Sequence, residues 1–392
     1  MAKIAIIINS LYTIGGEERV VSLMANEFVK YHEVTIISSE TRRKENGKRN
    51  NYYLDKRINV VVVEPKNDSI FDKVVKLIYW HIGVPNCGFC RKILNRIYYP
   101  NEYLNIWTDR INSGNFDIVI PITGNNTMLV GLIKERITAR CISWEHSSYE
   151  GYFAKKTGAF KCREKTFSEC ANKLEGVVVL NEDIQSKYKS QLNVKSIVIE
   201  NPKSFSSNEK CDLCNKVIVS CGRLESEKAF DDLIYAFELF HRKNTEWKLK
   251  IIGGGRLEGQ LISQIKKLGL SEVVSITGYT DNVKEELLKG SIFCMTSRWE
   301  GFPMTITEAL EVGLPVVGYG IPALKPLISD GIEGIIVPPY ERNKLVEALE
   351  EIANSDKIRM SMSLAAIEKA KLLKPEAIYE KWDVLFKKVM SE

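Results

Sequence analysis

Short apolar runs alternate with helical stretches along this chain, and the alternation occurs twice. Runs of this length and composition are typical of buried parallel strands. Their alternation with helices predicts two doubly wound α/β sheets. The expected strands are 3–9, 34–38, 58–63, 116–123, 140–146 and 176–181 in the first series, and 217–220, 249–252, 273–276, 292–295, 316–319 and 334–337 in the second.

At 392 residues the chain is long enough for two domains with full cores. The first series predicts an N-terminal domain over 1–200, and the second predicts a C-terminal domain over 201–374. Residues 203–216, which are rich in Ser, Asn and Lys, are expected to form a linker or hairpin between them. Ligands gather beyond the carboxyl ends of the strands in such sheets, so binding residues are expected in the segments that follow the strands.

One such segment, Ile292–Gly320, has the order strand, loop, helix, strand. It carries two acids, Glu300 and Glu308, and Gly301 with Pro303 keeps the first acid in the loop ahead of the helix. The N–H groups of the first turn, from Gly301 onward, can donate to an oxygen-rich ligand, and the carboxylates can accept from hydroxyls. That combination suits a sugar. The alternative is a solvated helix whose first turn carries acids that stabilise it.

Two cations follow the first strand of the second series. Arg223 and Lys228 lie five residues apart on a strand-end loop, where both can converge on one diphosphate. Arginine would offer a bidentate fork and lysine a point charge. The alternative is a pair of solvated charges.

The two acids and their surroundings resemble a known signature. Glu300-Gly-Phe-Pro-Met-Thr-Ile-Thr-Glu308, followed by Ala309-Leu310 and Gly313-Leu-Pro-Val-Val, resembles the E-x7-E motif of the retaining nucleotide-sugar glycosyltransferases of family 4. The resemblance covers nearly the whole chain and is strongest over 217–339. It implies the GT-B fold, an α/β fold of two Rossmann-like domains facing a cleft, with 375–392 as a helix that crosses back to the first domain.

The resemblance also implies roles for the residues that match the family pattern. Glu300 would lie against the donor sugar, Glu308 would bind the ribose hydroxyls, and Arg223 with Lys228 would clamp the diphosphate. Three further segments resemble those near the diphosphate, the donor and the base: Gly15-Gly16, Gly253–Arg256 and Gly278–Val283. The expected donor-binding residues are Gly15, Gly16, Arg223, Lys228, Gly254, Asn282, Val283, Glu300, Gly301, Phe302, Pro303, Met304 and Glu308. The expected catalytic residues are Glu300, Arg223, Lys228 and His146.

His146 is alone among four histidines in falling at the end of an expected strand. It is either a ligand of the transferred sugar or the acceptor hydroxyl, or a hydrogen-bonded loop histidine. Together with Glu145 and Asn125, which also follow strands, it forms the expected acceptor-binding set. The other three histidines, His32, His81 and His241, are expected at the surface.

The sequence contains no Asp-x-Asp pair, the usual carboxylate ligand of a diphosphate-bound Mg²⁺ or Mn²⁺. Protein cations and helix N-termini would then neutralise the departing diphosphate, so we predict transfer without a metal ion or other cofactor. The nine cysteines are expected to be free thiols. A zinc site is the alternative, because Cys87 with Cys90 and Cys211 with Cys214 have the C-x-x-C spacing.

Basic charge is concentrated in one part of the chain. Thr41–Arg110 carries 14 Lys or Arg and 7 Asp or Glu, against 55 and 50 in the whole sequence. Within it, an insertion over about 66–110 interleaves cations with aromatic residues. It either meets the anionic head groups of a membrane or packs on its domain. Nucleic acid is not expected as a partner, because no RNA-binding motif is present and the rest of the chain is slightly acidic.

No apolar run is long enough to span a membrane, and the N-terminus has the pattern of a core strand. The chain is therefore expected to be cytoplasmic, with peripheral contact to the inner face of the membrane if the insertion binds anionic lipid.

Taken with the resemblance, the residues predict retaining transfer of a hexose or N-acetylhexosamine from a nucleoside diphosphate sugar, with UDP as the expected nucleotide. The acceptor would be a hydroxyl of a glycan or lipid-linked saccharide in cell-surface polysaccharide synthesis. Two alternatives remain at this point. One is a sugar-nucleotide epimerase or hydrolase of the same fold, and the other is a non-catalytic module that binds sugar nucleotides or membranes.

Overall fold

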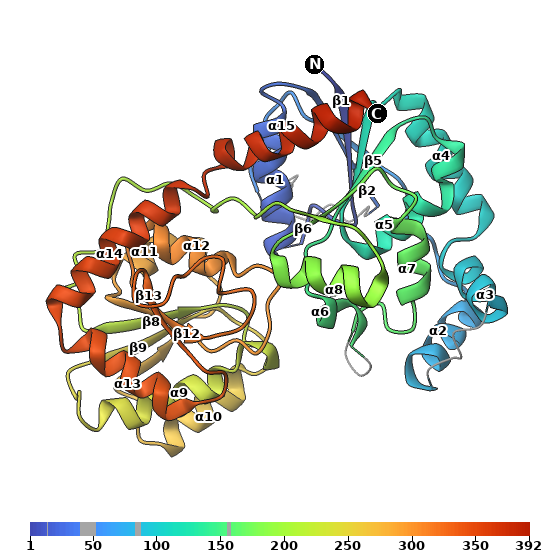
Figure 1. The fold of residues 1–392 in the computed structure, drawn as a ribbon. Coiled ribbons are helices and arrows are strands. Elements are labelled where there is room, and N and C mark those ends of the chain that lie inside the picture. The colour runs from blue at the N-terminus through green and yellow to red at the C-terminus, as the bar shows by residue number, and fades with distance from the viewer. Residues whose placement is uncertain (14, 40–51, 83–87, 155–157) are drawn as a thin grey trace. The chain divides into compact units, whose positions relative to one another are not determined.

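The computed structural model describes residues 1–13, 15–39, 52–82, 88–154 and 158–392. These residues divide into two compact units. The first unit contains 1–201 and 375–392, and the second contains 202–374. Each unit is built on one parallel sheet with helices on both faces (Figure 1). The predicted pair of doubly wound α/β sheets is therefore confirmed.

The sheet of the first unit has seven strands in the order β3-β2-β1-β4-β5-β6-β7. Because β1 lies between β2 and β4, the chain leaves β1 on one side and later returns on the other. The direction of winding therefore reverses between β1 and β4, where such sheets bind ligands. The strands are β1 (Lys3–Ile8), β2 (Glu33–Ser38), β3 (Asn59–Val62), β4 (Ile118–Pro121), β5 (Arg140–Trp144), β6 (Gly176–Val179) and β7 (Ile197–Val198).

Helix α5 begins at Thr123, directly after β4. Asn125 therefore lies in the first turn of a helix and not in a loop. The helices are α1 (Gly16–Phe28), α2 (Ile70–Ile82), α3 (Gly88–Tyr98), α4 (Asn101–Gly114), α5 (Thr123–Ile133), α6 (Tyr149–Phe153), α7 (Glu164–Ala171), α8 (Glu182–Leu192) and α15 (Pro375–Ser391), with a short η1 (Lys134–Arg136).

The last helix, α15, packs on α1 within the first unit (Figure 1). Trp382 is fully buried, and its ring lies 5.7 Å from that of Phe28, edge to face. His32 Nε2 lies 3.0 Å from the hydroxyl of Tyr379. His32 is thus half-buried, as is His241, so the prediction that both lie at the surface is wrong. His81 is exposed, as predicted.

The sheet of the second unit has six strands in the order β10-β9-β8-β11-β12-β13. The winding reverses between β8 and β11, which pair through Ile218 with Ile292 and Val219 with Phe293. The strands are β8 (Val217–Cys221), β9 (Lys248–Ile252), β10 (Val274–Ile276), β11 (Ile292–Met295), β12 (Val316–Tyr319) and β13 (Gly334–Val337). The helices are η2 (Ser226–Lys228), α9 (Phe230–His241), α10 (Glu258–Lys267), α11 (Val283–Leu288), α12 (Met304–Glu311), α13 (Arg342–Ala353) and α14 (Asp356–Lys371).

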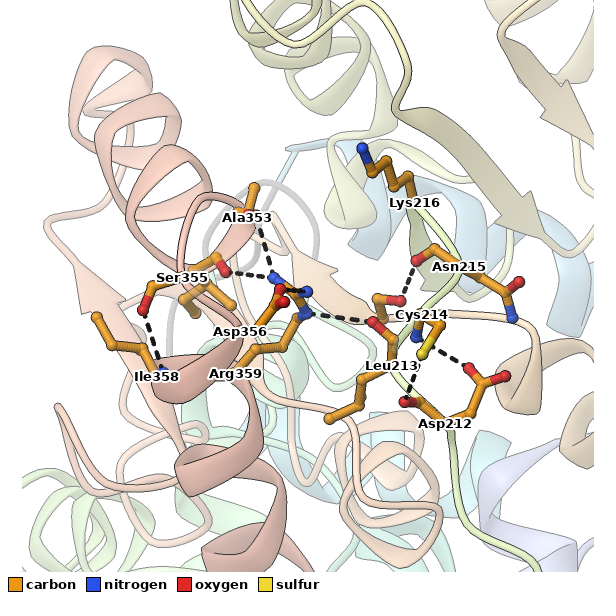
Figure 2. Close-up of polar contacts among 12 residues, drawn as sticks. Asp212, Leu213, Cys214, Asn215, Lys216, Ala353, Ser355, Asp356, Ile358 and Arg359 are labelled. Carbon is orange, nitrogen blue, oxygen red and sulfur yellow. Dashed lines mark hydrogen bonds and ion pairs between the residues drawn. The ribbon is translucent and has the colours of Figure 1, made fainter.

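Residues 203–216 do not form the expected linker or hairpin. They are part of the second unit and pack on its other elements, and the backbone N–H of Cys211 donates to the carbonyl of Val312 at 2.8 Å. Figure 2 shows how Arg359 fastens this segment: its guanidinium donates to the carbonyls of Leu213 and Ala353, at 3.3 and 3.0 Å. Because Ala353 ends α13, one cation both holds the segment and satisfies a helix C-terminus.

The basic aromatic insertion is divided between inward and outward side chains. Lys66 turns inward and pairs with Asp68 and Asp72, both at 3.1 Å. Among the aromatic residues, Tyr99 and Trp107 are buried. The insertion also exposes hydrophobic side chains, which among the described residues are Ile70, Phe71, Val74, Leu77 and Ile78 of α2, Phe89 and Ile93 of α3, and Ile106 of α4. Packing on the domain thus accounts for one side of the insertion and leaves the other side uncovered.

None of the described helices combines the length and the apolar character that are needed to cross a bilayer.

Candidate active site

Two loops at the carboxyl edge of the second sheet carry the predicted donor-site residues. One loop follows β8 and contains Arg223 and Lys228, and the other follows β11 and contains Glu300. Because β8 and β11 are neighbours at the point where the winding reverses, their loops leave the sheet side by side. Lys228 and Glu300 are 72 residues apart in sequence, and this topology brings them together in space.

Hydrogen bonds join the two loops: groups of the loop after β11 donate to backbone carbonyls of the loop after β8. The hydroxyl of Thr296 lies 3.1 Å from the carbonyls of both Lys228 and Ala229. The backbone N–H of Arg298 donates to the carbonyl of Glu227 at 2.7 Å, and its guanidinium donates to the carbonyl of Ser226 at 2.7 Å. These bonds fix the backbone on which Lys228 stands relative to the loop that carries Glu300.

Lys228 and Glu300 form an ion pair at this junction. The ammonium nitrogen lies 2.5 Å from Glu300 Oε1, and the hydroxyl of Ser297 donates to the same oxygen at 2.8 Å. The side chains are only 15% and 12% exposed, so the pair is partly shielded from water. A cation and an anion held at contact can serve a ligand that carries both negative charge and hydroxyl groups, as a sugar diphosphate does.

The side chain of Arg223 does not join the Lys228–Glu300 pair. The side chain is 67% exposed, and its guanidinium lies 3.5 Å from Glu227 Oε1. The structure therefore brings Lys228 and Glu300 together but leaves Arg223 on the rim, where its long side chain is free to move toward a ligand.

Helix α12 begins at Met304, directly after the predicted loop, and Pro303 occupies the N-cap position. The N–H of Gly301, which is predicted to belong to the first turn, lies ahead of the helix. The free N–H groups of this helix therefore belong to Met304 and the residues after it, and Gly301 and Phe302 lie in the loop. Glu308, one turn further along, is 2% exposed.

The loop after β9 packs between the loops after β8 and β10, and glycines in it allow the close contacts. The N–H of Leu224 donates to the carbonyl of Gly254 at 3.0 Å. A Cβ on Gly255 would lie 2.7 Å from the backbone of Leu224, and a Cβ on Gly254 would lie 2.8 Å from the ring of Tyr279. Because Gly254 has no side chain, the ring of Tyr279 can pack against it while its carbonyl accepts the hydrogen bond from Leu224.

Tyr279 lies within the predicted segment 278–283, although the sequence reasoning assigned its side chain no role of its own. Its side chain is 72% exposed, although its ring rests against Gly254. An exposed aromatic ring of fixed position beside a nucleotide-type loop is a platform for a flat ligand. The available signal was a lone tyrosine after a strand of a Rossmann-like domain. The neighbouring predicted residues, Asn282 and Val283, stand at the start of α11.

The predicted residues of the first unit also lie at the carboxyl edge of their sheet. Gly15 precedes α1 and accepts a hydrogen bond from the hydroxyl of Tyr52 at 3.0 Å, and Gly16 is the first residue of the helix. Asn125 stands in the first turn of α5, after β4. Glu145 and His146 follow β5.

Burial governs the protonation of Glu145 and His146. Glu145 is fully buried and accepts a hydrogen bond from Thr127 at 2.5 Å, and burial raises the pKa of its carboxyl to about 7. Burial lowers the pKa of His146 to about 3, so its imidazole is neutral near pH 7. Its ring lies 4.5 Å from that of Trp144, and its Nε2 is buried without a hydrogen-bond partner in the described residues.

Glu17 is a second acid that the sequence reasoning missed. Burial, with the nearby charges of Glu18 and Glu145, raises the pKa of Glu17 to about 8. Its position in the first turn of α1 was visible in the sequence, but an acid there is ordinarily a solvated stabiliser of the helix.

The cysteines among the described residues are free thiols and form no disulfide with one another. Cys87 of the first C-x-x-C pair lies outside the described residues. Cys211 is buried with its sulfur 3.4 Å from the carbonyl of Leu287, and Cys214 is exposed. Among the described residues no group of three or more His, Cys, Asp and Glu side chains is arranged to hold a metal ion.

A comparison with known protein families matches one family model to this chain. Residues 204–369, nearly the whole second unit, match the family model described as glycosyl transferases group 1. The second unit is therefore similar to the group 1 glycosyltransferases, and the match covers less than half of the chain. The predicted family resemblance and the enzyme class are therefore confirmed.

Relatives of this glycosyltransferase align along its full length. An uncharacterized glycosyltransferase of Haemophilus influenzae is 25% identical over 97% of this chain and 99% of its own. The "GalNAc-alpha-(1->4)-GalNAc-alpha-(1->3)-diNAcBac-PP-undecaprenol alpha-1,4-N-acetyl-D-galactosaminyltransferase" of Campylobacter jejuni is 26% identical, and the alignment covers 100% of both chains. Among solved structures, Anabaena HepE in complex with UDP superposes with a TM-score of 0.76, at 15% identity, over 99% of this chain and 100% of its own. The likeness identifies the fold of the glycosyltransferase as GT-B.

The raised pKa of Glu145 makes the stability of the glycosyltransferase depend on pH. Because the folded state holds a proton between the ordinary pKa of 4.5 and about 7, stability falls as the pH rises through that window. Glu145→Gln removes the titration, so its free energy of unfolding is expected to fall less than that of the wild type between pH 5 and 8, by roughly 3 kcal/mol. Urea unfolding at several pH values measures the difference.

Glu102→Gln is the control for the pH dependence of Glu145→Gln, because it changes an exposed glutamate of α4 in the same unit. Its pH profile should follow that of the wild type. The lowered pKa of His146 acts with the opposite sign, but it is common to all three proteins and cancels in the difference. Parallel profiles for Glu145→Gln and the wild type would show that the carboxyl is already ionised in the folded protein.

Proposed function

We propose that this glycosyltransferase moves a hexose or N-acetylhexosamine from a UDP-sugar to a hydroxyl of a glycan or lipid-linked saccharide, with retention of the anomeric configuration. The product would serve cell-surface polysaccharide synthesis. The observation that carries the proposal is the Lys228–Glu300 pair, held by two bonded loops where the second sheet reverses its winding. The relatives support it, because HepE is described in complex with UDP and the Campylobacter enzyme is named for a diphospho-undecaprenol-linked acceptor.

The second unit is the proposed donor site. Lys228 would leave Glu300 in part to neutralise the diphosphate, joined by Arg223 from the rim. Glu300 would then accept a hydrogen bond from a sugar hydroxyl, and Glu308 would bind the ribose. The N-terminus of α12 and these two cations supply the positive charge that the leaving diphosphate requires, so we expect transfer without a metal ion.

Tyr279 completes the proposed donor site at the base. Its exposed ring rests on Gly254 and can stack with a nucleobase. Asn282 and Val283 follow it and would contact the base mainly through their backbone. Stacking tolerates any base, so Tyr279 would contribute affinity for the nucleotide and little discrimination between uracil and guanine.

The first unit is the proposed acceptor site. Asn125, Glu145 and His146 stand at the carboxyl edge of its sheet, beside the Gly15–Gly16 turn. The neutral His146 offers its imidazole to an acceptor hydroxyl or to the transferred sugar. No dedicated base is required in a retaining reaction of this kind, because the departing phosphate oxygen can take the acceptor proton as the new glycosidic bond forms. The leaving group then departs as the protonated nucleoside diphosphate.

The test of this function is nucleotide release from UDP-glucose, UDP-galactose, UDP-N-acetylglucosamine and UDP-N-acetylgalactosamine, and from the corresponding GDP-sugars. Each is measured with and without a bacterial membrane-lipid extract, in parallel reactions that contain excess EDTA or excess Mg²⁺. Release of UDP from one donor that grows with the extract is the expected result. Release that ignores the extract would favour a hydrolase or epimerase, and no release from any donor would favour a non-catalytic module. Activity that EDTA abolishes and Mg²⁺ restores would contradict the metal-free mechanism.

A cytoplasmic location with peripheral contact to the inner face of the membrane is part of the proposal. The outer face of α2 exposes Phe71, Val74, Leu77 and Ile78, and Lys73 beside them is also exposed. Apolar side chains next to a cation suit the interface of an anionic bilayer. No nucleic acid partner is proposed.

Retention on vesicles tests the contact. Phe71→Ser with Leu77→Ser is expected to weaken binding to phosphatidylglycerol vesicles at low salt by at least tenfold, because each side chain gives up about 1.5 kcal/mol or more of apolar burial. Cosedimentation measures the bound fraction. Met360→Ser with Leu364→Ser, a matched exposed pair on α14, should bind as the wild type does. Equal losses for both pairs, or no retention of the wild type, would remove the support for membrane docking.

A further inference from the structure

A buried arginine without a carboxylate partner lies next to the proposed acceptor site. Arg163, which immediately precedes α7, is 4% exposed, and no ion pair is found for it within the described parts of the chain. Its guanidinium lies over aromatic rings instead, 4.0 Å from the ring centroid of Tyr98 and 5.3 Å from that of Tyr99. Its Nε is buried without a hydrogen-bond partner among the same residues. A buried cation that lacks an anion lowers stability, so packing alone does not account for it.

Within the described residues the guanidinium donates one hydrogen bond, to a hydroxyl that in turn contacts Asn125. Arg163 donates to the hydroxyl oxygen of Tyr99 at 2.9 Å. The hydroxyl of Tyr99 lies 2.8 Å from both the backbone carbonyl and the side-chain Oδ1 of Asn125. Because arginine can only donate, the phenol oxygen accepts from it and directs its own hydrogen to Asn125. Burial raises the pKa of Tyr99 to about 12, so the hydroxyl keeps that hydrogen at neutral pH.

The orientation of Asn125 follows from this chain of bonds. With Oδ1 turned to Tyr99, the two N–H groups of the side-chain amide point away from it and are available to an acceptor oxygen. The turn is also held from its other side. A Cβ on Gly124 would lie 2.7 Å from the ring of Phe160, whose centroid is 5.9 Å from the guanidinium of Arg163. Arg163 therefore lies near two rings that contact this turn, those of Tyr99 and Phe160.

We propose that Arg163 and Tyr99 are positioning residues for the acceptor: through the Tyr99 hydroxyl they hold the amide of Asn125 toward an acceptor hydroxyl. The inference rests on the proposed function, because it takes Asn125 as an acceptor ligand. Neither residue touches the substrate itself. Their effect is on acceptor affinity and not on the breaking of the donor bond in the second unit.

The Tyr99→Phe variant tests the inference, because it removes one hydroxyl and keeps the ring. The assay is UDP release from the preferred UDP-sugar, titrated with the membrane-lipid extract. The extract concentration for half-maximal stimulation is expected to rise about tenfold, the value of one well-placed hydrogen bond. The maximal rate and the slow hydrolysis of donor without extract should stay at wild-type values. Arg163→Lys, which keeps the charge but loses the fork, should move the half-maximal concentration in the same direction.

Tyr98→Phe is the matched control. It removes the hydroxyl of the adjacent tyrosine, keeps the ring over Arg163, and should leave the titration unchanged. An unchanged half-maximal concentration in Tyr99→Phe would overturn the inference, and so would an equal loss of extract-free hydrolysis, which would indicate general damage. A wild type that releases UDP but ignores the extract would overturn the acceptor proposal itself, and with it this role for Arg163.

Discussion

Glu300→Gln is expected to lower the rate of sugar transfer by about 10²- to 10³-fold, with a smaller change in donor KM. The substitution keeps the shape of the side chain and removes its charge. Lys228, which lies 2.5 Å from Glu300, then loses its anionic partner, and the sugar hydroxyl loses a charged acceptor. The loss should appear mainly in kcat, because charge develops at this position as the bond to the diphosphate breaks. Steady-state kinetics with the preferred donor measures it.

Two further variants sharpen this prediction. Glu272→Gln changes an exposed glutamate before β10 in the same unit and should leave kcat unchanged. Lys228→Met should be as damaging as Glu300→Gln, and the double variant should be little worse than either, because paired residues act as a unit. Near-normal turnover of Glu300→Gln would remove this carboxylate from the reaction. Losses that multiply in the double variant would show that the two residues act independently.

Glu311→Ala is expected to have the largest effect on stability, a loss of about 3–5 kcal/mol in the free energy of unfolding. Glu311 is 4% exposed on α12, one turn beyond Glu308, and it pairs with the buried Lys203 and with Lys210. The N–H of Ser207 donates to it at 2.8 Å. Burial works against its charge, but these partners hold the pKa of its carboxyl below the ordinary value. Removing the carboxylate leaves the ammonium of Lys203 buried and unpaired.

Urea unfolding of the full chain measures the loss, and a double variant tests its cause. Glu311→Leu with Lys203→Met replaces the pair by apolar groups of similar size and should recover most of the stability. Since the pKa of Glu311 is lowered, its contribution should be present above about pH 4.5 and fall away in more acid solution. A single variant within 1 kcal/mol of the wild type, or a double variant as unstable as the single, would contradict this account of the pair.

The sequence was informative where local pattern determines structure. Short apolar runs predicted all six strands of the second sheet and six of the seven in the first, and β7 was missed because two residues carry no periodic signal. The pair of loops that holds Lys228 and Glu300 could also be expected. Parallel strands align their carboxyl ends, and the order of the strands then sets two loops side by side.

What the sequence could not provide are contacts between distant segments that no local rule connects. Lys203 and Glu311 are 108 residues apart, and a lysine in a polar stretch has the pattern of a linker until its partner is known. Arg163 is similar, because its partners Tyr98 and Tyr99 come from α3 and the residue after it, and Tyr99 is 64 residues away in sequence.

The most direct test of the central claim is the anomeric configuration of the product. The transferase is incubated in EDTA with the UDP-sugar that supports extract-dependent release, and the newly formed linkage is read from its anomeric proton coupling by NMR at early times. An α-linkage from an α-configured donor is the predicted result, and it should be absent with Glu300→Gln. A β-linkage would contradict retaining transfer at the Lys228–Glu300 site, whatever the identity of the acceptor.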